Sequence, residues 1–352
     1  MKLSVIVPCF NVAPYLNRSL MSLVNQTLTD IEIICIDDKS GDGTRELLRD
    51  WAKRDLRVRV IENKKNIGAG PGRNLGIDSA AGEYVGFMDP DDYVDEDFFG
   101  RLCAAADKTG KQVISGQLCI SELNGKKTIN PFRTPSALKK SHHNWKFHYT
   151  AVYRRDFLNR RNIRYANLSV GEDIIFEALA KCALAPSDFG IARGTFYHYC
   201  RRMDSLASDV YDEKKFRDMS FCINALVDIY NNAGVSEKDY ICGAHGYFNY
   251  LKMAMIEKNK IRNVQLIAAD ALCEIFHKLQ FRDRLRKKDW PLYLALSHRD
   301  AGAVRDLIVA ECTVKHTVFK LFGFLPFFRI ADNIKKKDFR LFGILILRLR
   351  IQ

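Results

Sequence analysis

The sequence lacks the features that mark secreted, zinc-binding or membrane-spanning chains. Its ten cysteines never occur as Cys-x-x-Cys, so neither a zinc ribbon nor a thioredoxin-like redox motif is indicated. No stretch of 18 uncharged apolar residues occurs, and the first apolar run, 3–8, is too short for the core of a signal peptide. We therefore expect a cytoplasmic protein with reduced thiols and without a membrane-spanning helix.

Two common nucleotide-binding loops are also missing. A dinucleotide-binding unit needs a glycine-rich turn directly after its first strand, but here the first predicted strand runs into Pro8-Cys-Phe-Asn11. The glycine-rich run 68–72 follows the third predicted strand, which is the wrong place for that motif. A Walker lysine loop does not occur either. These absences argue against a dehydrogenase and a P-loop enzyme.

The first 116 residues alternate short β-branched runs with amphipathic helical segments. This alternation is typical of a parallel sheet with helices on both faces. The predicted strands are 3–8, 31–37, 57–62, 83–88 and 112–116. The predicted helices are 13–26, 42–53, 70–80 and 95–108. The sequence therefore predicts an α/β fold of the nucleotide-binding type.

Changes in pattern along the chain predict three regions. At about 150 residues per domain, 352 residues correspond to roughly two domains. We expect the first domain over 1–210, with halves 1–116 and 117–210. A helical region rich in Ala, Leu, Lys and Arg follows over 211–312, and a basic tail over 313–352.

The basic tail carries more than half of the net positive charge. Lys and Arg exceed Asp and Glu by 55 − 42 = 13 in the chain and by 9 − 2 = 7 in residues 313–352. The tail also repeats an aromatic and basic pattern, at 319–326 and again at 339–346. Such a segment is suited to the interface of an anionic membrane. The alternative is a terminal hairpin or helix packed on the body with its basic face in water. No nucleic-acid partner is indicated, because no segment matches a nucleic-acid module.

An acidic cluster, Asp89-Pro-Asp-Asp92, follows the fourth predicted strand. Ligands of α/β sheets bind at the carboxyl ends of strands. Neighbouring carboxylates repel one another unless a cation lies between them, and their oxygens suit Mg²⁺ or Mn²⁺ carrying a diphosphate. The alternative is a loop in which an aspartate caps the helix predicted from 95.

Six segments, in this order, resemble the motif series of family 2 glycosyltransferases. They are 5–11, 22–27, 36–44, 66–76, 82–92 and 171–176. The resemblance covers about residues 1–205 and rests on all six motifs falling in sequence. It implies a GT-A fold, a Rossmann-like and mostly parallel sheet flanked by helices, followed here by the helical C-terminal region. It also implies a nucleoside diphosphate sugar donor, a divalent cation (Mn²⁺ or Mg²⁺) and inversion at the anomeric carbon.

The resemblance also assigns residues to the nucleotide sugar. By position in the motifs, Pro8, Phe10 and Asn11 border the nucleoside, and Asp38 accepts a hydrogen bond from the base, commonly uracil. Asp37 serves structurally beside it.

The diphosphate and metal residues follow in the same way. Arg73 lies near the diphosphate, a role that its charge suits, with a helix-surface arginine as the alternative. Asp91 or Asp92 meets the metal, and the other members of the acidic cluster, Asp89 included, meet the ribose or the sugar.

The remaining assignments concern the acceptor side. The resemblance implies that Asp173, next to Glu172, is the general base, whereas the alternative is an acidic pair favoured by the helix dipole. His198, Arg201 and Arg202 belong to a segment that closes over the diphosphate or the acceptor, although a partly buried structural role suits His198 equally. Trp145 stacks on a sugar face or fills the core.

These assignments predict a metal-dependent transferase that moves a sugar from a UDP-sugar to a hydroxyl of a glycan or lipid-linked saccharide. Such an enzyme would build cell-surface polysaccharide or lipopolysaccharide at the inner face of the cell membrane, as a peripheral protein. Two alternatives remain, a noncatalytic nucleotide-sugar or carbohydrate-binding scaffold and a sugar nucleotidyltransferase. The second normally carries a glycine-rich basic loop after the first strand, which this chain lacks.

Overall fold

The computed structural model describes residues 1–121, 127–129, 148–201, 212–235 and 298–308, with single helical positions at 266, 269, 273 and 295. It also describes the backbone of 328–333, 336–341 and 344–350. The chain divides into two compact units, Met1–Asp209 with Asp228–Gly243, and Val210–Val227 with Ala244–Gln352. The domain boundaries expected from the sequence stay predictions.

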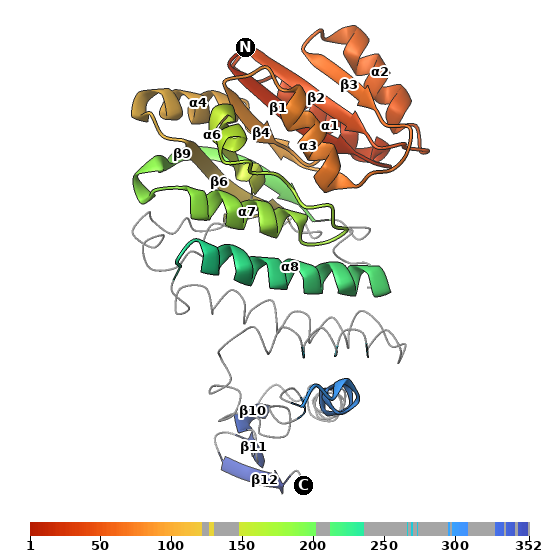
Figure 1. Cartoon of the computed structure of the whole chain (residues 1–352), viewed down its shortest axis with the longest axis vertical. Helices are drawn as coiled ribbons and strands as arrows, with labels where there is room; N and C mark the ends of the chain where they lie inside the picture. The colour runs from red at the N-terminus through yellow and green to blue at the C-terminus, as the bar shows by residue number, and fades with distance from the viewer. Residues whose placement is uncertain are drawn as a thin grey trace. The chain divides into compact units, whose positions relative to one another are not determined.

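Alternating strands and helices build the first part of the first unit, as the periodicity predicts (Figure 1). The strands are β1 (Leu3–Cys9), β2 (Ile31–Asp37), β3 (Val58–Glu62), β4 (Tyr84–Phe87), β5 (Tyr93–Val94) and β6 (Val113–Ser121). The helices are α1 (Ala13–Val24), α2 (Thr44–Arg54), α3 (Ala69–Ser79) and α4 (Phe98–Thr109). All nine predicted elements are confirmed, with ends displaced by a few residues.

Shorter elements complete the unit after residue 121. They are β7 (Lys127–Ile129), η1 (His148–Thr150), β8 (Ala151–Arg154), α6 (Arg155–Arg160), α7 (Glu172–Ala183), η2 (Pro186–Asp188) and β9 (Phe189–Cys200). The α7 helix contains most of the motif segment 171–176.

The central sheet has the order β3-β2-β1-β4-β8-β6-β9-β5, with β7 paired to β6. The first four strands pair in parallel, so β1, β2 and β4 all end at one edge. The β6–β9 pair is parallel too, whereas the β4–β8, β6–β8, β5–β9 and β6–β7 pairs are antiparallel. The α3 helix packs on β1 and β2, and α4 packs on β6, β8 and β9. The result is the α/β sheet flanked by helices that the sequence predicts.

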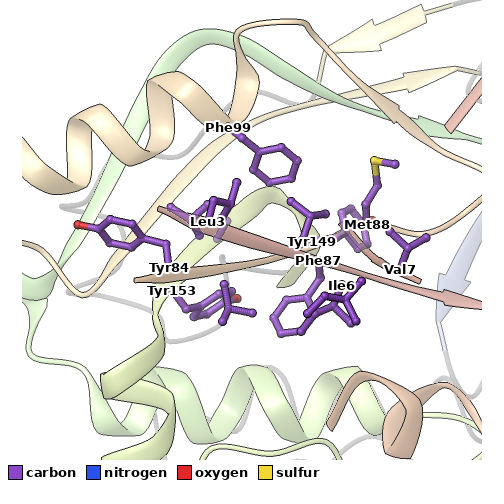
Figure 2. Close-up of a cluster of buried hydrophobic side chains, with 14 of the residues drawn as sticks. Leu3, Ile6, Val7, Tyr84, Phe87, Met88, Phe99, Tyr149 and Tyr153 are labelled. Carbon is purple, nitrogen blue, oxygen red and sulfur yellow. The ribbon is translucent and has the colours of Figure 1, made fainter. Parts of the chain in front are cut away.

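The core lies on both faces of this sheet. Every residue of β2 is buried, as expected for a central parallel strand covered by helices on both sides. Aromatic side chains dominate beside β1 and β4, where Tyr84, Phe87 and Tyr153 are fully buried (Figure 2). Burying one such side chain contributes roughly 1.5–3 kcal/mol. This packing holds the strand ends, and therefore the site, in place.

A close approach between α3 and β1 depends on glycine. A Cβ atom added at Gly76 would lie 2.4 Å from Cγ2 of Ile6, well inside van der Waals contact. The α3 helix therefore lies directly on the strand, and its first turn reaches the carboxyl edge of the sheet.

In the C-terminal region, the described residues include a long helix, a helical segment over 301–308 and a small sheet. The helix α8 (Glu213–Asn232) has buried residues at Phe216, Ile223 and Tyr230, a seven-residue spacing typical of one helix face. The strands β10 (Phe328–Asn333), β11 (Lys336–Leu341) and β12 (Ile344–Arg350) pair antiparallel. Within the part of the chain that the structure describes, no helix is both long and apolar enough to cross a bilayer.

Candidate active site

The candidate site begins at the carboxyl ends of β1 and β2, where two loops are joined by Asn11. The backbone N–H of Asn11 donates to Oγ of Ser40 (3.1 Å), and its Oδ1 accepts from the N–H of Gly41 (2.9 Å). Asn11 adopts φ 52°, a left-handed conformation that asparagine tolerates. The predicted nucleoside residues lie here, with Phe10 47% exposed and Pro8 half-buried in β1. Their contact with a nucleoside stays a prediction.

Asp37 and Asp38 are both buried at this edge but hold different partners. Asp37 accepts from Nε of Arg45 at 2.8 Å and from the N–H of Ser40 at 3.2 Å. Both carboxylate oxygens of Asp38 accept hydrogen bonds, from the side-chain amide of Asn63 and the backbone N–H groups of Ile67 and Gly68 at 2.8–3.1 Å. Asp38 therefore organises the loop that leads into α3, in addition to any contact with a base.

The three aspartates of the acidic loop after β4 differ in how deeply they are buried. Asp89 is 26% exposed at its side chain and Asp91 is half-buried. The backbone N–H of Asp89 donates to the hydroxyl of Tyr197 (3.0 Å), and the backbone oxygen of Asp91 accepts from Nη2 of Arg18 (2.6 Å). These contacts hold the loop from β9 on one side and from α1 on the other.

Asp92 differs from its neighbours because it is completely buried. Its Oδ1 accepts from the backbone N–H of Cys200 (2.7 Å), and its Oδ2 accepts from the hydroxyl of Tyr197 (2.8 Å). Burial raises the pKa of Asp92 well above its ordinary value, and the charges of Asp89 and Asp91 raise it further. Asp92 connects the acidic loop to β9, and its predicted contact with a metal stays a prediction.

The acidic loop can be compared with the ligands that a divalent cation prefers. Among the described residues, no group of three or more His, Cys, Asp and Glu side chains is placed to hold an ion by itself. Asp89 and Asp91 offer carboxylate oxygens on the same loop, and such ligands fit a cation such as Mg²⁺ that takes its other ligands from phosphates and water. The donor set suits Mg²⁺ or Mn²⁺ and offers no soft ligand.

Arg73, on α3, links the acidic loop to α7. Its Nη2 contacts Oδ1 of Asp89 at 2.8 Å, and its Nη1 contacts Oε1 of Glu172 at 3.2 Å. The side chain is 6% exposed and lies over the ring of Tyr165, 5.2 Å from the centroid. Burial by itself lowers the pKa of Arg73, but the charge of Asp89 and its other neighbours raise it above its ordinary value. The predicted surface arginine is thus excluded, and the predicted diphosphate contact stays untested.

Gly171, with φ 84°, directly precedes the α7 helix. Glu172 and Asp173 therefore occupy the first turn of this helix. Negative side chains are favoured there by the helix dipole. This turn lies against α3, because a Cβ atom at Gly70 would be 2.4 Å from the backbone oxygen of Ala166 and 3.2 Å from Cγ of Glu172. The glycine at position 70 is what allows the two acidic motifs to meet.

Asp173, the predicted general base, is half-buried and accepts a hydrogen bond from the N–H of Ile174 at 2.9 Å. Burial raises its pKa to about 6, and the charge of Glu172 adds to this rise, while Arg73 lowers it. A carboxylate with this pKa is ionised at neutral pH and still accepts a proton more readily than an ordinary aspartate.

His198 and Arg201 lie on and after β9. The His198 ring stacks on Tyr93 at 4.3 Å between centroids, and its Nε2 lies 2.7 Å from Oδ1 of Asp95. These contacts give His198 a packing role. The backbone N–H of Arg201 donates to the carbonyl of Ser121 (3.0 Å), and its side chain is exposed. Trp145 and Arg202 lie outside the described residues.

Three residues of the site were not assigned from the sequence. Arg18 holds the carbonyl of Asp91, and Tyr197 binds Asp92 and the N–H of Asp89. Glu177 lies one turn after Asp173 on α7 and is 8% exposed. The four-residue spacing from Asp173 was a readable signal for Glu177, whereas nothing local marked Arg18.

Comparisons with known proteins agree with this geometry. Residues 4–164 match Glycosyl transferase family 2. The chain is 34% identical over 189 residues to "Uncharacterized glycosyltransferase EpsJ" of Bacillus subtilis, covering 49% of this chain and 52% of the relative. It is 30% identical over 214 residues to "Succinoglycan biosynthesis protein ExoO" of Rhizobium meliloti, covering 55% of this chain and 59% of the relative. The chain thus spans a little over half the length of these curated relatives.

A solved structure extends the likeness to the fold. The crystal structure of S. aureus TarS 1–349 in complex with UDP matches with a TM-score of 0.69 and 21% identity, covering 97% of each chain. This likeness identifies the arrangement of the elements as a GT-A fold. Residues 4–164 of this chain are therefore similar to glycosyl transferase family 2, and the arrangement of the elements is that of a GT-A fold.

Proposed function

We propose that this protein is an inverting glycosyltransferase. It moves a sugar from a UDP-sugar to a hydroxyl group of a glycan or lipid-linked saccharide during the synthesis of a cell-surface polysaccharide. The donor assignment is supported by TarS, whose structure is in complex with UDP, and the product class by the succinoglycan relative.

One observation carries the proposal, the contact of Arg73 with both acidic segments. A single buried guanidinium lies within 3.2 Å of Glu172 and 2.8 Å of Asp89, although these residues are 99 and 16 positions away from it in the chain. It therefore places the loop suited to a cation next to the turn that carries Asp173. A transferase needs these two functions side by side, one for the leaving diphosphate and one for the attacking hydroxyl.

Asp173 supplies the base in this proposal. Its carboxylate accepts the proton of the acceptor hydroxyl as that oxygen bonds to the anomeric carbon, and the bond from that carbon to the diphosphate oxygen breaks on the opposite face. With a pKa of about 6, Asp173 is ionised at neutral pH before the acceptor binds. Glu172 stays paired with Arg73 and orients the turn.

Asp89 and Asp91 would hold the divalent cation, which stabilises negative charge on the leaving diphosphate when bound. Asp92 holds this loop to β9 through hydrogen bonds from Tyr197 and Cys200. The loop is therefore fixed before any ligand arrives, which lowers the cost of arranging charged groups during the reaction.

The test is release of UDP over a panel of UDP-sugars with Mn²⁺ or Mg²⁺ and a detergent-solubilised lipid extract as the acceptor source. We expect Asp173→Asn to lower kcat about 1,000-fold, because the amide cannot accept the proton. Asp156→Asn is the matched control, since Asp156 also lies in the first turn of a helix, α6, and its side chain is 71% exposed. An Asp173→Asn protein that releases UDP at the wild-type rate would refute the assignment.

The proposal also places the enzyme on the inner face of the cell membrane through residues 313–352. The support is the charge of this tail, nine basic against two acidic residues, with apolar residues interleaved. We expect the full chain to sediment with vesicles that contain phosphatidylglycerol and not with pure phosphatidylcholine vesicles. Lys336→Ala should weaken this binding about fivefold, the value of about 1 kcal/mol per charge near an anionic surface. Equal binding to both vesicle types would contradict the membrane contact.

A further inference from the structure

Glu177 is a buried carboxylate on α7 to which the sequence motifs assign no role. It follows Asp173 by four residues, so the two carboxylates lie on one face of the helix, one turn apart. Glu177 is 8% exposed, and an acidic residue is seldom buried to this degree without specific partners. Its position behind the base therefore calls for a physical explanation.

The contacts of Glu177 connect α7 to the strand that supports the acidic loop. Its Oε1 accepts a hydrogen bond from the backbone N–H of His148 in η1 at 2.9 Å. The η1 turn runs directly into β8, which pairs with β4, and β4 leads to Asp89. Glu177 thus fixes the position of the base helix relative to the strand that leads into the acidic loop.

The surroundings of η1 make this bond costly to lose. The ring of His148 packs edge-on against Phe87, Tyr165 and Phe176, with centroids 5.5–6.3 Å apart. Its backbone oxygen accepts from the hydroxyl of Tyr153 at 3.2 Å. Without Glu177, the backbone N–H of His148 would be left unpaired in this apolar cluster, where water does not replace the partner.

The charges around the two carboxylates come from several elements. On α7, Glu177 faces Asp173 and Lys181, whose Nζ lies 3.5 Å from Oε2. The charge of Glu177 also contributes to the raised pKa of Tyr149 in η1 and of Tyr153 in β8. Asp173 faces Glu172, Arg73 of α3, Asp89 and Tyr165. Burial raises the pKa of Glu177 to about 7, Lys181 lowers it and Asp173 raises it, so both carboxylates are largely ionised above pH 7.5.

The imidazole of His148 does not neutralise this pair. Burial lowers the pKa of His148 well below its ordinary value, and the charge of Arg73 lowers it further. The ring is therefore neutral over the range in which the two carboxylates titrate.

We propose that Glu177 is a positioning residue for Asp173, anchoring α7 to η1 through the His148 N–H and adding, at alkaline pH, a negative charge one helical turn behind the base. The proposal rests on the proposed function for the role of Asp173. Replacing Glu177 by glutamine removes its charge but keeps an oxygen for the His148 N–H, whereas removing the whole side chain releases the helix from η1.

The first experiment compares Glu177→Gln with Glu177→Ala in the UDP-release assay from pH 5 to 9. Glutamine keeps an oxygen for the His148 N–H, so we expect kcat at pH 8 to stay within about threefold of wild type. The acidic limb of its pH profile should stay in place, because Glu177, with a pKa of about 7, is mostly protonated where Asp173, with a pKa of about 6, titrates. Alanine should lower kcat at least tenfold, the loss expected for a base whose helix is no longer held.

Glu32→Gln is the matched control, since Glu32 is also buried and hydrogen-bonded, to Ser4, Arg59 and the N–H of Ala81. It lies at the other end of β2 from the site, so its substitution should leave both kcat and the acidic limb in place. Wild-type kcat in Glu177→Ala, or a kcat in Glu177→Gln as low as that in Glu177→Ala, would overturn the proposal.

A second experiment needs no turnover. Melting temperatures of Asp173→Asn, Glu177→Gln and the double variant form a double-mutant cycle. At pH 8 the double variant should gain less stability than the sum of the single gains, because each single change already removes the repulsion. At pH 5 the changes should add. Additivity at both pH values would overturn the role of Glu177, whereas coupling in a protein that releases no UDP would refute the proposed function alone.

Discussion

The two acidic segments of the site, the loop Asp89–Asp92 and the first turn of α7, are held in place by different partners. In the loop, Asp92 is fully buried and takes two donors from β9. In the turn, Glu172 is held by a charged partner, Arg73. One carboxylate of each segment is thus held by another element, and the proposed cation ligand and the proposed base lie beside it.

The two segments also differ in the chemistry proposed for their carboxylates. The proposed cation takes carboxylate oxygens as ligands, and Asp89 lies 2.8 Å from the guanidinium of Arg73. A general base requires a raised proton affinity, and burial together with the charge of Glu172 brings the pKa of Asp173 to about 6. Arg73 contacts both segments, but only Asp92 of the loop also takes two neutral donors, Tyr197 and Cys200.

The largest effect on this comparison should come from Arg73→Met, which removes the contact between the segments. We expect a loss of about 3 kcal/mol in the free energy of unfolding, because Asp89 and Glu172 lose their shared partner. Displacement of the base should lower kcat about 100-fold. The acidic limb of the pH profile should move to higher pH, because Arg73 lowers the pKa of Asp173. Chemical unfolding measures the loss of stability, and UDP release at different pH values measures kcat and the acidic limb.

Arg59→Met is the control for Arg73→Met, because Arg59 also pairs with a buried glutamate, Glu32, at 2.6 Å. It should cost stability without moving the acidic limb. A protein with Arg73→Met that keeps wild-type kcat would mean that the two segments act independently.

A second pair of substitutions sharpens the contrast within the loop. Asp92→Ala should lower the free energy of unfolding by about 1–3 kcal/mol, since it orphans the buried N–H of Cys200 and the hydroxyl of Tyr197. Asp91→Ala should change stability by less than about 0.5 kcal/mol. It should instead raise the Mn²⁺ concentration for half-maximal UDP release at least about tenfold. Equal effects of the two substitutions on stability and on metal dependence would remove the distinction drawn between these aspartates.

The third prediction concerns the cost of holding a base at raised pKa. The pKa of Asp173 rises from 3.8 to about 6 on folding, so the folded protein binds its proton more tightly, and ionisation reduces stability as pH rises through this window. Asp173→Asn should therefore melt at a higher temperature than wild type at pH 7.5, and the gap should close towards pH 4. An identical pH dependence of the two melting temperatures would show that Asp173 has no raised pKa.

Local patterns were sufficient for the elements of the first 116 residues. The segment 31–37 was predicted as a strand and is β2, and the helix predicted over 13–26 is α1, Ala13–Val24. Strand and helix periodicity depend on side chains a few residues apart, so a single sequence contains them. The strands β5, β8 and β9 were not predicted, because each is short or irregular and gains its partners from distant segments.

The roles of individual carboxylates depended on distant partners. The sequence marks Asp91 and Asp92 as equal candidates for a metal, and only the hydrogen bonds from Tyr197 and Cys200, 105 and 108 residues away, separate them. Arg73 was expected near the diphosphate on the strength of its motif, and its buried position between Asp89 and Glu172 depends on the packing of α3 against α7.

The sequence by itself therefore determined the α/β class, the order of the first elements and the motif series of the family, because these are carried by short-range spacing and by residue types that chemistry requires. Only the tertiary structure decided which carboxylates are locked and which are presented, and that Glu177 lies behind the base. The physical reason is that burial, hydrogen-bond partners and pKa arise from groups that folding brings together from separate parts of the chain.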